Sequence, residues 1–216
     1  MSSGPVIIVL AAGLGSRFQD AGHKLSQPLG ATSVLGATLA QAMGSQLPLI
    51  VVTTESLVDE ATRYVARQDI VVLETASGRP VEDRGDLRAM NARLGMGASI
   101  AAGVSASSNA SGWLVLPGDM PMLQSSTLLR VAHALRDHAV SYAQHHGRRG
   151  HPVGFSAELY SELIRLQGDE GARRLVSRYP AQAIEVDDPG VLVDVDTVAD
   201  LAQVRAMWAR AAAAPG

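Results

Sequence analysis

The sequence predicts an α/β protein with an open, mostly parallel sheet. Val6–Leu10 is a continuous run of β-branched and aliphatic residues, as expected for a strand that is buried on both faces. Ser33–Met43 then has apolar residues at helical spacing, and Leu49–Val52 is a second short apolar run. Strands that alternate with helices at this spacing are typical of βαβ units, and such units build parallel sheets.

The same alternation continues along the chain. Ser56 is expected to cap a helix that runs to about Ala66. Further strands are predicted at Ile70–Leu73, Trp113–Leu116, Val140–Ala143, Val153–Phe155, Ala183–Val186 and Leu192–Val195. Further helices are predicted at Ala98–Ala106, Ser125–His138, Ala157–Leu166, Ala172–Tyr179 and Thr197–Ala212. The charged stretch Glu74–Arg93 indicates a long loop, and such loops are usually functional or disordered. Because no repeat or linker divides the sequence, residues 1–216 are expected to form one domain.

Composition and charge exclude several classes of function. Of the 216 residues, 47% are hydrophobic and 18% are charged, which is typical of a globular protein and not of a disordered chain. The formal net charge is −3, and the basic pairs Arg148–Arg149 and Arg173–Arg174 are too few for a nucleic-acid groove. The absence of cysteine excludes disulfides and thiolate metal sites. The first apolar run is too short for a secretion signal or a membrane span, so we expect a cytoplasmic protein without membrane or nucleic-acid partners.

A glycine-containing turn follows the first predicted strand directly. In open α/β sheets ligands bind at the carboxyl ends of the strands, and Gly13 and Gly15 allow backbone N–H groups to approach phosphate oxygens closely. Arg17 can add a bidentate charged contact, and Lys24 can reach the same phosphates. The alternative is a tight strand-to-helix turn with a surface arginine. Phe18 stands where a dinucleotide-binding fingerprint needs a third small residue, and the sequence contains no Walker loop.

Carboxylates follow two later apolar runs. Asp119 comes after Trp113–Leu116 and is aimed at the ligand crevice, where Mg²⁺ favours one or two carboxylates together with substrate phosphates and water. Its alternative role is to cap the next helix, for which Ser125 is the better candidate. Asp194 and Asp196 point to the same side of a short predicted strand, and a shared cation would relieve their repulsion. The alternative is that one faces solvent while the other caps the C-terminal helix.

One histidine follows a basic, glycine-containing segment. Gly147–Gly150 includes two arginines and predicts a flexible bend, after which His151 precedes Pro152. A lone histidine is more often structural than functional. Its place beside a basic bend nevertheless suits the binding of an anionic acceptor.

Six motifs stand in order across nearly the whole chain. They are Leu10–Phe18, Lys24, Gly97–Ile100, Pro117–Pro121, Gly150–Pro152 and Asp194–Thr197. Together they resemble the molybdenum cofactor nucleotidyltransferases, and in particular their cytidylyltransferase branch. The chain departs from the family pattern at Gln19, where glycine is usual, and in the longer spacing to Lys24.

The resemblance implies a three-layer, Rossmann-like nucleotide-diphospho-sugar transferase fold. It implies a Mg²⁺ ion held by Asp119 and Asp196, an acceptor contact by His151, and a catalytic group formed by Arg17, Lys24 and Asp119. Nucleotide binding is implied for Leu10, Ala11, Ala12, Gly13, Gly15, Ser16, Arg17, Lys24 and Ser99. The guanylyl branch has a second glycine where this chain has Ala12, so the resemblance implies CTP as the donor.

The implied reaction moves CMP from CTP to the terminal phosphate of a molybdopterin-type cofactor and releases pyrophosphate, and the product would pass to a molybdoenzyme or its chaperone. Two alternatives stay open. One is a related enzyme that uses a sugar or polyol phosphate, and the other is a non-catalytic relative that holds nucleotide or cofactor. Retention of Lys24, Asp119 and Asp196 together disfavours a mere binder. A NAD-binding domain is disfavoured because Thr53 and Thr54 stand where an acidic residue should end the second strand.

Overall fold

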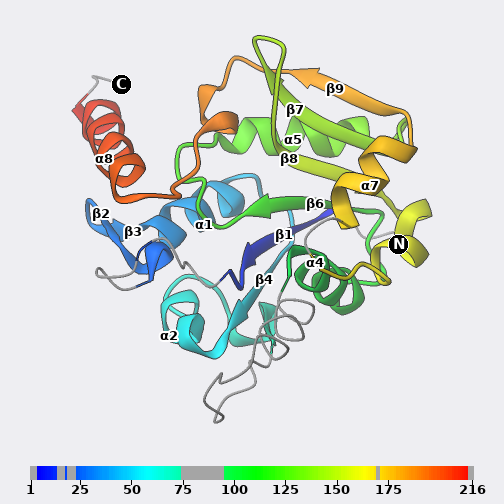
Figure 1. Ribbon diagram of the computed structural model, residues 1–216, viewed down its shortest axis with the longest axis horizontal. Helices are drawn as coiled ribbons and strands as arrows, with labels where there is room; N and C mark the ends of the chain where they lie inside the picture. Colours follow the sequence, from blue (N-terminus) through cyan, green and yellow to red (C-terminus); the bar gives the residue numbers. More distant parts are fainter. Residues whose placement is uncertain (1–3, 14–17, 19–22, 74–94, 169–170, 214–216) are drawn as a thin grey trace.

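A seven-stranded sheet forms the centre of the fold in the computed structural model, which describes residues 4–13, 18, 23–73, 95–168 and 171–213 (Figure 1). Its strands are β1 (Val6–Ala11), β4 (Leu49–Thr54), β5 (Ile70–Leu73), β6 (Gly112–Pro117), β7 (Val140–His145), β8 (Arg148–Ser156) and β9 (Ala181–Glu185). A separate hairpin consists of β2 (Pro28–Leu29) and β3 (Thr32–Ser33).

The order of the strands in the sheet is β5-β4-β1-β6-β8-β7-β9. Strands β5, β4, β1 and β6 are parallel, β8 is antiparallel to both of its neighbours, and β9 is parallel to β7. The prediction of a mostly parallel sheet is therefore confirmed. The chain leaves β1 toward β4 and β5 on one side and returns to β6 on the other, so the strand order reverses between β1 and β6. Ligands of open α/β sheets bind outside the carboxyl ends of the strands at such a point.

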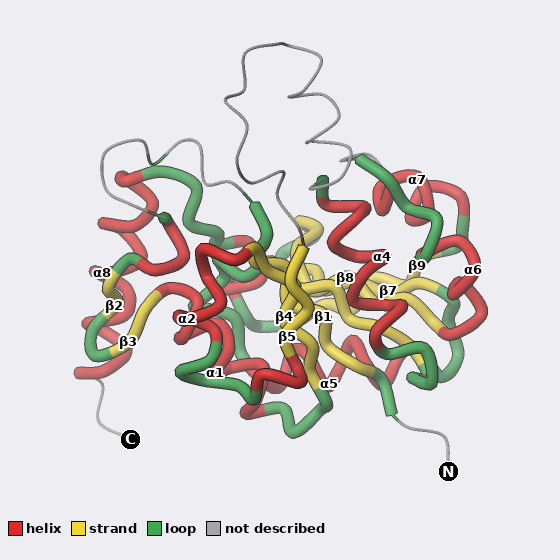
Figure 2. Tube along the Cα trace, turned by 90° about the horizontal axis from the view of Figure 1, so that it is seen from below, coloured by secondary structure: helices red, strands yellow, loops and turns green. Residues whose placement is uncertain are grey.

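Helices cover both faces of the sheet, which confirms the three-layer arrangement. The helices are α1 (Val34–Gly44), α2 (Val58–Ala61), α4 (Met96–Ala106), α5 (Ser125–Ala134), α6 (Tyr160–Leu163), α7 (Gly171–Arg178) and α8 (Val198–Ala213). Both faces are covered because the strands are apolar on both sides, as β1 shows. Ile7 and Val9 pack into the core shared with α1, α2, α5 and α8. Ile8 packs into the core on the other face, which is shared with α4, α6 and α7. Figure 2 shows the sheet separating α1, α2 and α8 from α4, α6 and α7. Within the described ranges, no helix has both the length and the apolar character needed to cross a membrane.

Several local predictions were wrong. The expected strand at Leu192–Val195 is a 3-10 helix, Pro189–Leu192, followed by irregular chain that bonds to the turn after β6 instead of to a strand. The helix expected from Ser56 to Ala66 is limited to a 3-10 turn and the single turn of α2, and Ser56 does not cap it. Tyr64 turns inward there, and its hydroxyl lies 3.0 Å from the Thr32 hydroxyl.

The third correction concerns the basic segment near residue 150. The chain reverses at His146 and Gly147, which both have positive φ, and Arg148 already begins β8. Positive φ at both central residues is the geometry of a tight hairpin turn. Of the flexible bend predicted over Gly147–Gly150, Gly147 belongs to this turn and Arg148–Gly150 form the start of β8. The predicted loop Glu74–Arg93 lies outside the described residues.

Gly150 allows the C-terminal segment to pack directly on β8, and its replacement is predicted to destabilise the protein. A Cβ at Gly150 would lie 2.2 Å from the Val191 carbonyl oxygen, so the 3-10 helix would have to move away. Gly150→Ala is expected to lower the free energy of unfolding by about 1–3 kcal/mol, measured by urea denaturation. Gly4→Ala is the control, because a Cβ there meets nothing within 4 Å. Equal stability of the two variants would contradict this packing.

Candidate active site

The ends of β1 and β6 are tied together at the point where the strand order reverses. The Gly118 N–H, just beyond β6, donates to the Leu10 carbonyl in β1 at 2.9 Å. Ala11 and Ala12 are buried at the end of β1, and Gly13 is exposed directly after them. The first four predicted nucleotide-binding residues therefore lie at the end of β1, beside the turn that follows β6.

The C-terminal segment is held against this crevice by backbone bonds. The Val195 N–H donates to the Asp119 carbonyl at 3.0 Å, which places Asp194 and Asp196 on either side of the attachment point. Asp196 does not cap the C-terminal helix, because the Asp200 carboxylate accepts from the Thr197 N–H and hydroxyl at 2.7 and 2.8 Å. The Asp196 carboxylate instead accepts from the Lys24 ammonium at 3.0 Å.

A buried aspartate that the sequence analysis missed anchors the other end of this segment. Asp188 Oδ2 accepts from the Gln124 N–H at 2.9 Å and from the Thr127 hydroxyl at 2.7 Å, while its Oδ1 accepts from the Gly190 N–H. The N-cap residue of α5 is Gln124 and not Ser125, whose hydroxyl donates to the Gln41 carbonyl. The turn sequence Asp-Pro-Gly at 188–190 was the available signal.

Lys24 lies between the carboxylates of Asp119 and Asp196. Its Nζ donates to Asp119 Oδ2 and, at 3.0 Å, to Asp196 Oδ1. The exposed fractions are 15% for Lys24 and 12% for Asp119, so this ion pair is largely shielded from water. Burial lowers the pKa of Lys24, but the attraction of Asp119 and then Asp196 outweighs burial and raises it above the ordinary value. Lys24 is the only lysine in the sequence.

The negative charge gathered here exceeds what one ammonium can neutralise. Asp119 Oδ1 is buried and has no hydrogen-bond partner among the described residues. The pKa of Asp194 is raised, first by burial and then by the nearby charge of Asp119. An orphaned carboxylate oxygen beside further acidic side chains fits a hard divalent cation.

The protein offers such a cation few ligands. Among the residues that the structure describes, no group of three or more acidic or histidine side chains has the geometry of a metal site. Asp119 and Asp196 would therefore supply two oxygens, and substrate phosphates and water would supply the rest. In nucleotide-dependent enzymes Mg²⁺ usually has this combination of one or two carboxylates with substrate phosphates and water.

His23 closes the glycine-containing segment and was missed as a functional residue. Its Nε2 lies 2.9 Å from the Gly13 carbonyl, and its Nδ1 accepts from the Leu25 N–H at 3.2 Å. Burial lowers the pKa of His23, so the neutral ring joins both ends of the segment that leads to Lys24. The predicted ligands Gly15, Ser16 and Arg17 lie outside the described residues.

His151 lies on β8 beyond the end of β6, but it does not act as a charged group at neutral pH. Burial and then the charge of Arg149 lower the pKa of His151 to about 4. Its Nδ1 is buried without a hydrogen-bond partner in the described part of the chain. An uncharged ring can exchange a hydrogen bond with a ligand, but it cannot supply the charge attraction that the sequence analysis expected from the basic segment.

Ser99 stands apart from the Lys24 cluster. It is buried in the first turn of α4, and its hydroxyl donates to the Gly95 carbonyl within that turn. The structure thus brings together Lys24, Asp119 and Asp196, with Asp194 and His151 beside them.

Comparison with known proteins identifies the relatives of this chain. A model of the family described as the MobA-like NTP transferase domain matches residues 7–184. The "Purine catabolism protein PucB" of Bacillus subtilis (strain 168) is 30% identical over 204 residues, which cover 92% of this chain and 94% of that protein.

Solved structures share the whole fold. Rv0371c from Mycobacterium tuberculosis H37Rv superposes with a TM-score of 0.75 at 26% identity over 95% of this chain and 100% of its own. A structure of the same protein in complex with manganese has a TM-score of 0.68 at 28% identity and the same coverage of both chains. Molybdopterin-guanine dinucleotide biosynthesis protein A from Archaeoglobus fulgidus has a TM-score of 0.64 over 95% of this chain and 99% of its own, and at 15% identity it supports the fold alone.

Asp119→Asn is predicted to remove the cation without unfolding the protein. The amide cannot supply the anionic oxygen, so nucleotide-dependent Mn²⁺ binding, measured by electron paramagnetic resonance, should be lost. Turnover should fall by more than the roughly 10–100-fold that is typical when a residue that only hydrogen-bonds to a metal ligand is replaced. Asp137→Asn, at an exposed position after α5, is the control and should leave both readouts unchanged. Normal Mn²⁺ binding by Asp119→Asn would reject Asp119 as a ligand.

Proposed function

Because the chain belongs to the MobA-like NTP transferase domain family, we propose that it transfers CMP from CTP to the terminal phosphate of a molybdopterin-type acceptor. Family membership makes it a nucleotidyltransferase of the MobA type that binds a nucleoside triphosphate. The observation that carries the proposal is the Lys24 ammonium between Asp119 and Asp196, directly beside the chain that leaves β1. We propose that residues 1–216 act as one nucleotidyltransferase domain in the cytoplasm.

The chemical step needs positioning and charge neutralisation more than acid–base catalysis. An oxygen of the acceptor phosphate attacks the α-phosphorus of CTP and forms the new P–O bond. The bond from the α-phosphorus to the bridging oxygen breaks, and pyrophosphate leaves with that oxygen. The attacking phosphate monoester is already an anion at neutral pH, since its second pKa is about 6. Holding two anions in line is therefore the main task of the protein.

Each predicted site residue has a role in that task. Lys24, with Arg17, neutralises the triphosphate, while Gly13, Gly15 and Ser16 present backbone N–H groups to it. A Mg²⁺ ion held by Asp119 and Asp196 supplies further neutralisation of the phosphates when it is bound. His151 offers its ring nitrogen to the acceptor. Leu10, Ala11 and Ser99 complete the nucleotide side, through backbone and packing contacts.

The choice of acceptor rests on the resemblance carried by the six sequence motifs and on the surroundings of His151. The uncharged ring of His151 is subject to the charge of Arg149 and to that of Asp194, so a phosphate bound there would meet both a cation and the acidic cluster. We propose that the product is then handed to a molybdoenzyme or its chaperone.

Pyrophosphate release tests the donor and the acceptor together. The purified protein is incubated with Mg²⁺ and each of the four triphosphates, in the presence of molybdopterin, a hexose 1-phosphate, a polyol phosphate or no acceptor. Release that requires both CTP and molybdopterin is expected. Rapid transfer to the sugar or polyol phosphate without turnover on molybdopterin would move the chain to another branch. The absence of release with every combination would instead indicate a non-catalytic relative.

Ala12 is predicted to contribute to the choice of base. Its side chain is 1% exposed at the end of β1, and the guanylyl branch carries a glycine there. If this methyl group restricts the base pocket, Ala12→Gly should shift the ratio of kcat/KM for CTP over GTP toward GTP. The effect should be modest, because one methyl group in a pocket is worth about 1–3 kcal/mol. An unchanged ratio of kcat/KM for CTP over GTP would show that Ala12 does not contribute to base selection.

A further inference from the structure

His23 uses both nitrogens of its ring. Nε2 lies 2.9 Å from the Gly13 carbonyl oxygen, and Nδ1 lies 3.2 Å from the Leu25 backbone nitrogen. The Leu25 N–H can only donate, so Nδ1 carries no proton, and the one ring proton of a neutral imidazole is then on Nε2, which donates it to Gly13. Burial lowers the pKa of His23, which favours this neutral form. The two contacts therefore define one tautomer of the ring.

The turn that carries Lys24 is built on His23. Lys24–Ser26 is a 3-10 helix, and His23 is the residue at its N-cap position. The His23 backbone carbonyl accepts from the Ser26 N–H at 3.1 Å and from the Ser26 hydroxyl at 2.9 Å. Leu25 is 3% exposed and packs in the same core as Val9 of β1. His23 and this core thus fix the backbone from which the Lys24 side chain projects.

The bond from His23 to Gly13 connects this turn to the sheet, because Gly13 is the second residue after the end of β1. The lysine side chain is a flexible four-carbon stem, so its ammonium group is held in one place only when its backbone is also fixed. Asp119 and Asp196 hold the Lys24 ammonium, and His23 holds the backbone at the other end of the stem. Loss of the bond to Gly13 would therefore let Lys24 move relative to the end of β1.

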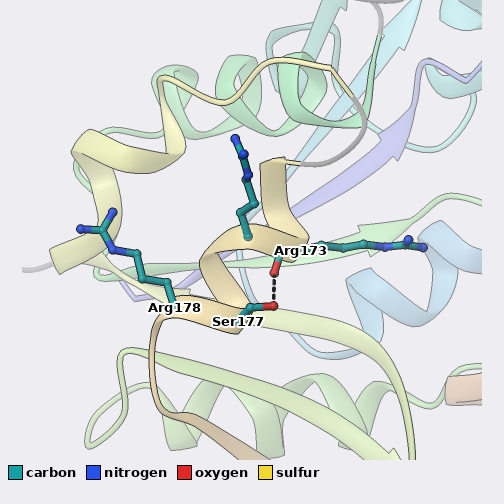
Figure 3. Close-up of a pocket in the computed structure, with 4 residues that line it drawn as sticks. Arg173, Ser177 and Arg178 are labelled. Atoms are coloured by element: carbon teal, nitrogen blue, oxygen red, sulfur yellow. Dashed lines mark hydrogen bonds between the residues drawn. The ribbon is translucent and has the colours of Figure 1, made fainter.

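Arginines elsewhere do not take the place of Lys24. A cavity of about 460 Å³ on α7 (Figure 3) is lined by Arg173, Arg174, Ser177 and Arg178. Leu175 and Val176 of this helix pack in the core on one face of the sheet, whereas Leu25 packs in the core on the other face. Arg178 is also paired with Glu162, at 3.4 Å. The positive charge beside Asp119 therefore depends on how Lys24 itself is held.

We propose that His23 is a positioning residue for nucleotidyl transfer, because its imidazole ring ties the Lys24 turn to the end of β1. The Lys24 ammonium is then presented to the triphosphate from a fixed backbone. His23 acts in this role through its hydrogen bonds and not through a charge. The inference rests on the proposed function, which gives Lys24 the task of neutralising the triphosphate.

Two substitutions separate the two hydrogen bonds of the ring. His23→Asn keeps an acceptor near the position of Nδ1, and asparagine is a good N-cap residue, but its shorter side chain does not reach the Gly13 carbonyl. His23→Gln has its amide nitrogen as many bonds from the backbone as Nε2 is, so it keeps a donor for Gly13. His138→Gln, at an exposed position after α5, is the control.

Steady-state kinetics measures the consequence for the nucleotide. His23→Asn is expected to raise the KM for CTP about three- to tenfold, the loss expected for one hydrogen bond, with no change in the KM for molybdopterin. His23→Gln should restore most of the unmodified KM for CTP, and His138→Gln should equal the unmodified protein. Thermal unfolding checks that all three variants are folded. An unchanged KM for CTP in His23→Asn would overturn the positioning role.

The motion of the Lys24 side chain can be measured without any substrate. Lys24 is the only lysine in the sequence, so protein labelled with ¹³C at lysine Cε gives one signal, whose relaxation reports motion on the picosecond-to-nanosecond timescale. We expect larger motion in His23→Asn than in His23→Gln, His138→Gln and the unmodified protein. Equal motion in all four would reject the inference while the proposed function stands. If the unmodified protein shows no turnover, the proposed function fails, and the relaxation data alone decide whether His23 holds Lys24.

Discussion

The arrangement at the carboxyl edge of the sheet depends on one ammonium group held between two carboxylates. Lys24 joins Asp119, which is 95 residues away in sequence, to Asp196, which is 172 residues away. Without this cation, three aspartates would lie close together in a partly buried position, and their mutual repulsion would oppose the docking of the C-terminal segment. In the proposed reaction the triphosphate attracts the same ammonium. Movement of Lys24 toward the phosphates would leave both carboxylates to a divalent cation, so that nucleotide and metal enter the site together.

Backbone hydrogen bonds fix the positions of the residues in this charge cluster. The Gly118 N–H binds the Leu10 carbonyl, and the next carbonyl, that of Asp119, binds the Val195 N–H. The turn after β6 is thereby fixed to β1 on one side and to the C-terminal segment on the other. Asp188 extends the same construction, because its carboxylate joins the chain at the start of α5 to the 3-10 helix that precedes Asp194. Each contact joins the loops at this edge to strands or helices that are buried in the two cores.

The local pattern of apolar residues was sufficient to predict the parallel strands. Most of the features that it did not predict are contacts between residues that are far apart in the sequence. The buried runs of β1, β4, β5 and β6 were predicted because a strand covered on both faces is apolar at every position. The same logic placed Asp119 at the crevice. It failed at Leu192–Val195, where an apolar run is buried by the turn after β6 and not by a neighbouring strand. The pairing of Lys24 with Asp119 and Asp196 depends on tertiary packing, which no local sequence pattern records.

The single lysine of this chain allows the central interaction to be measured directly. Protein labelled with ¹³C at lysine Cε gives one side-chain signal, whose pH titration reports the pKa of Lys24. We expect a midpoint above the ordinary value of 10.5 in the nucleotide-free protein. We also expect the position of the signal at neutral pH to change when CTP and Mg²⁺ are added. A midpoint at or below 10.5, together with a signal that CTP and Mg²⁺ do not move, would contradict the role of Lys24 as the group shared between carboxylates and nucleotide.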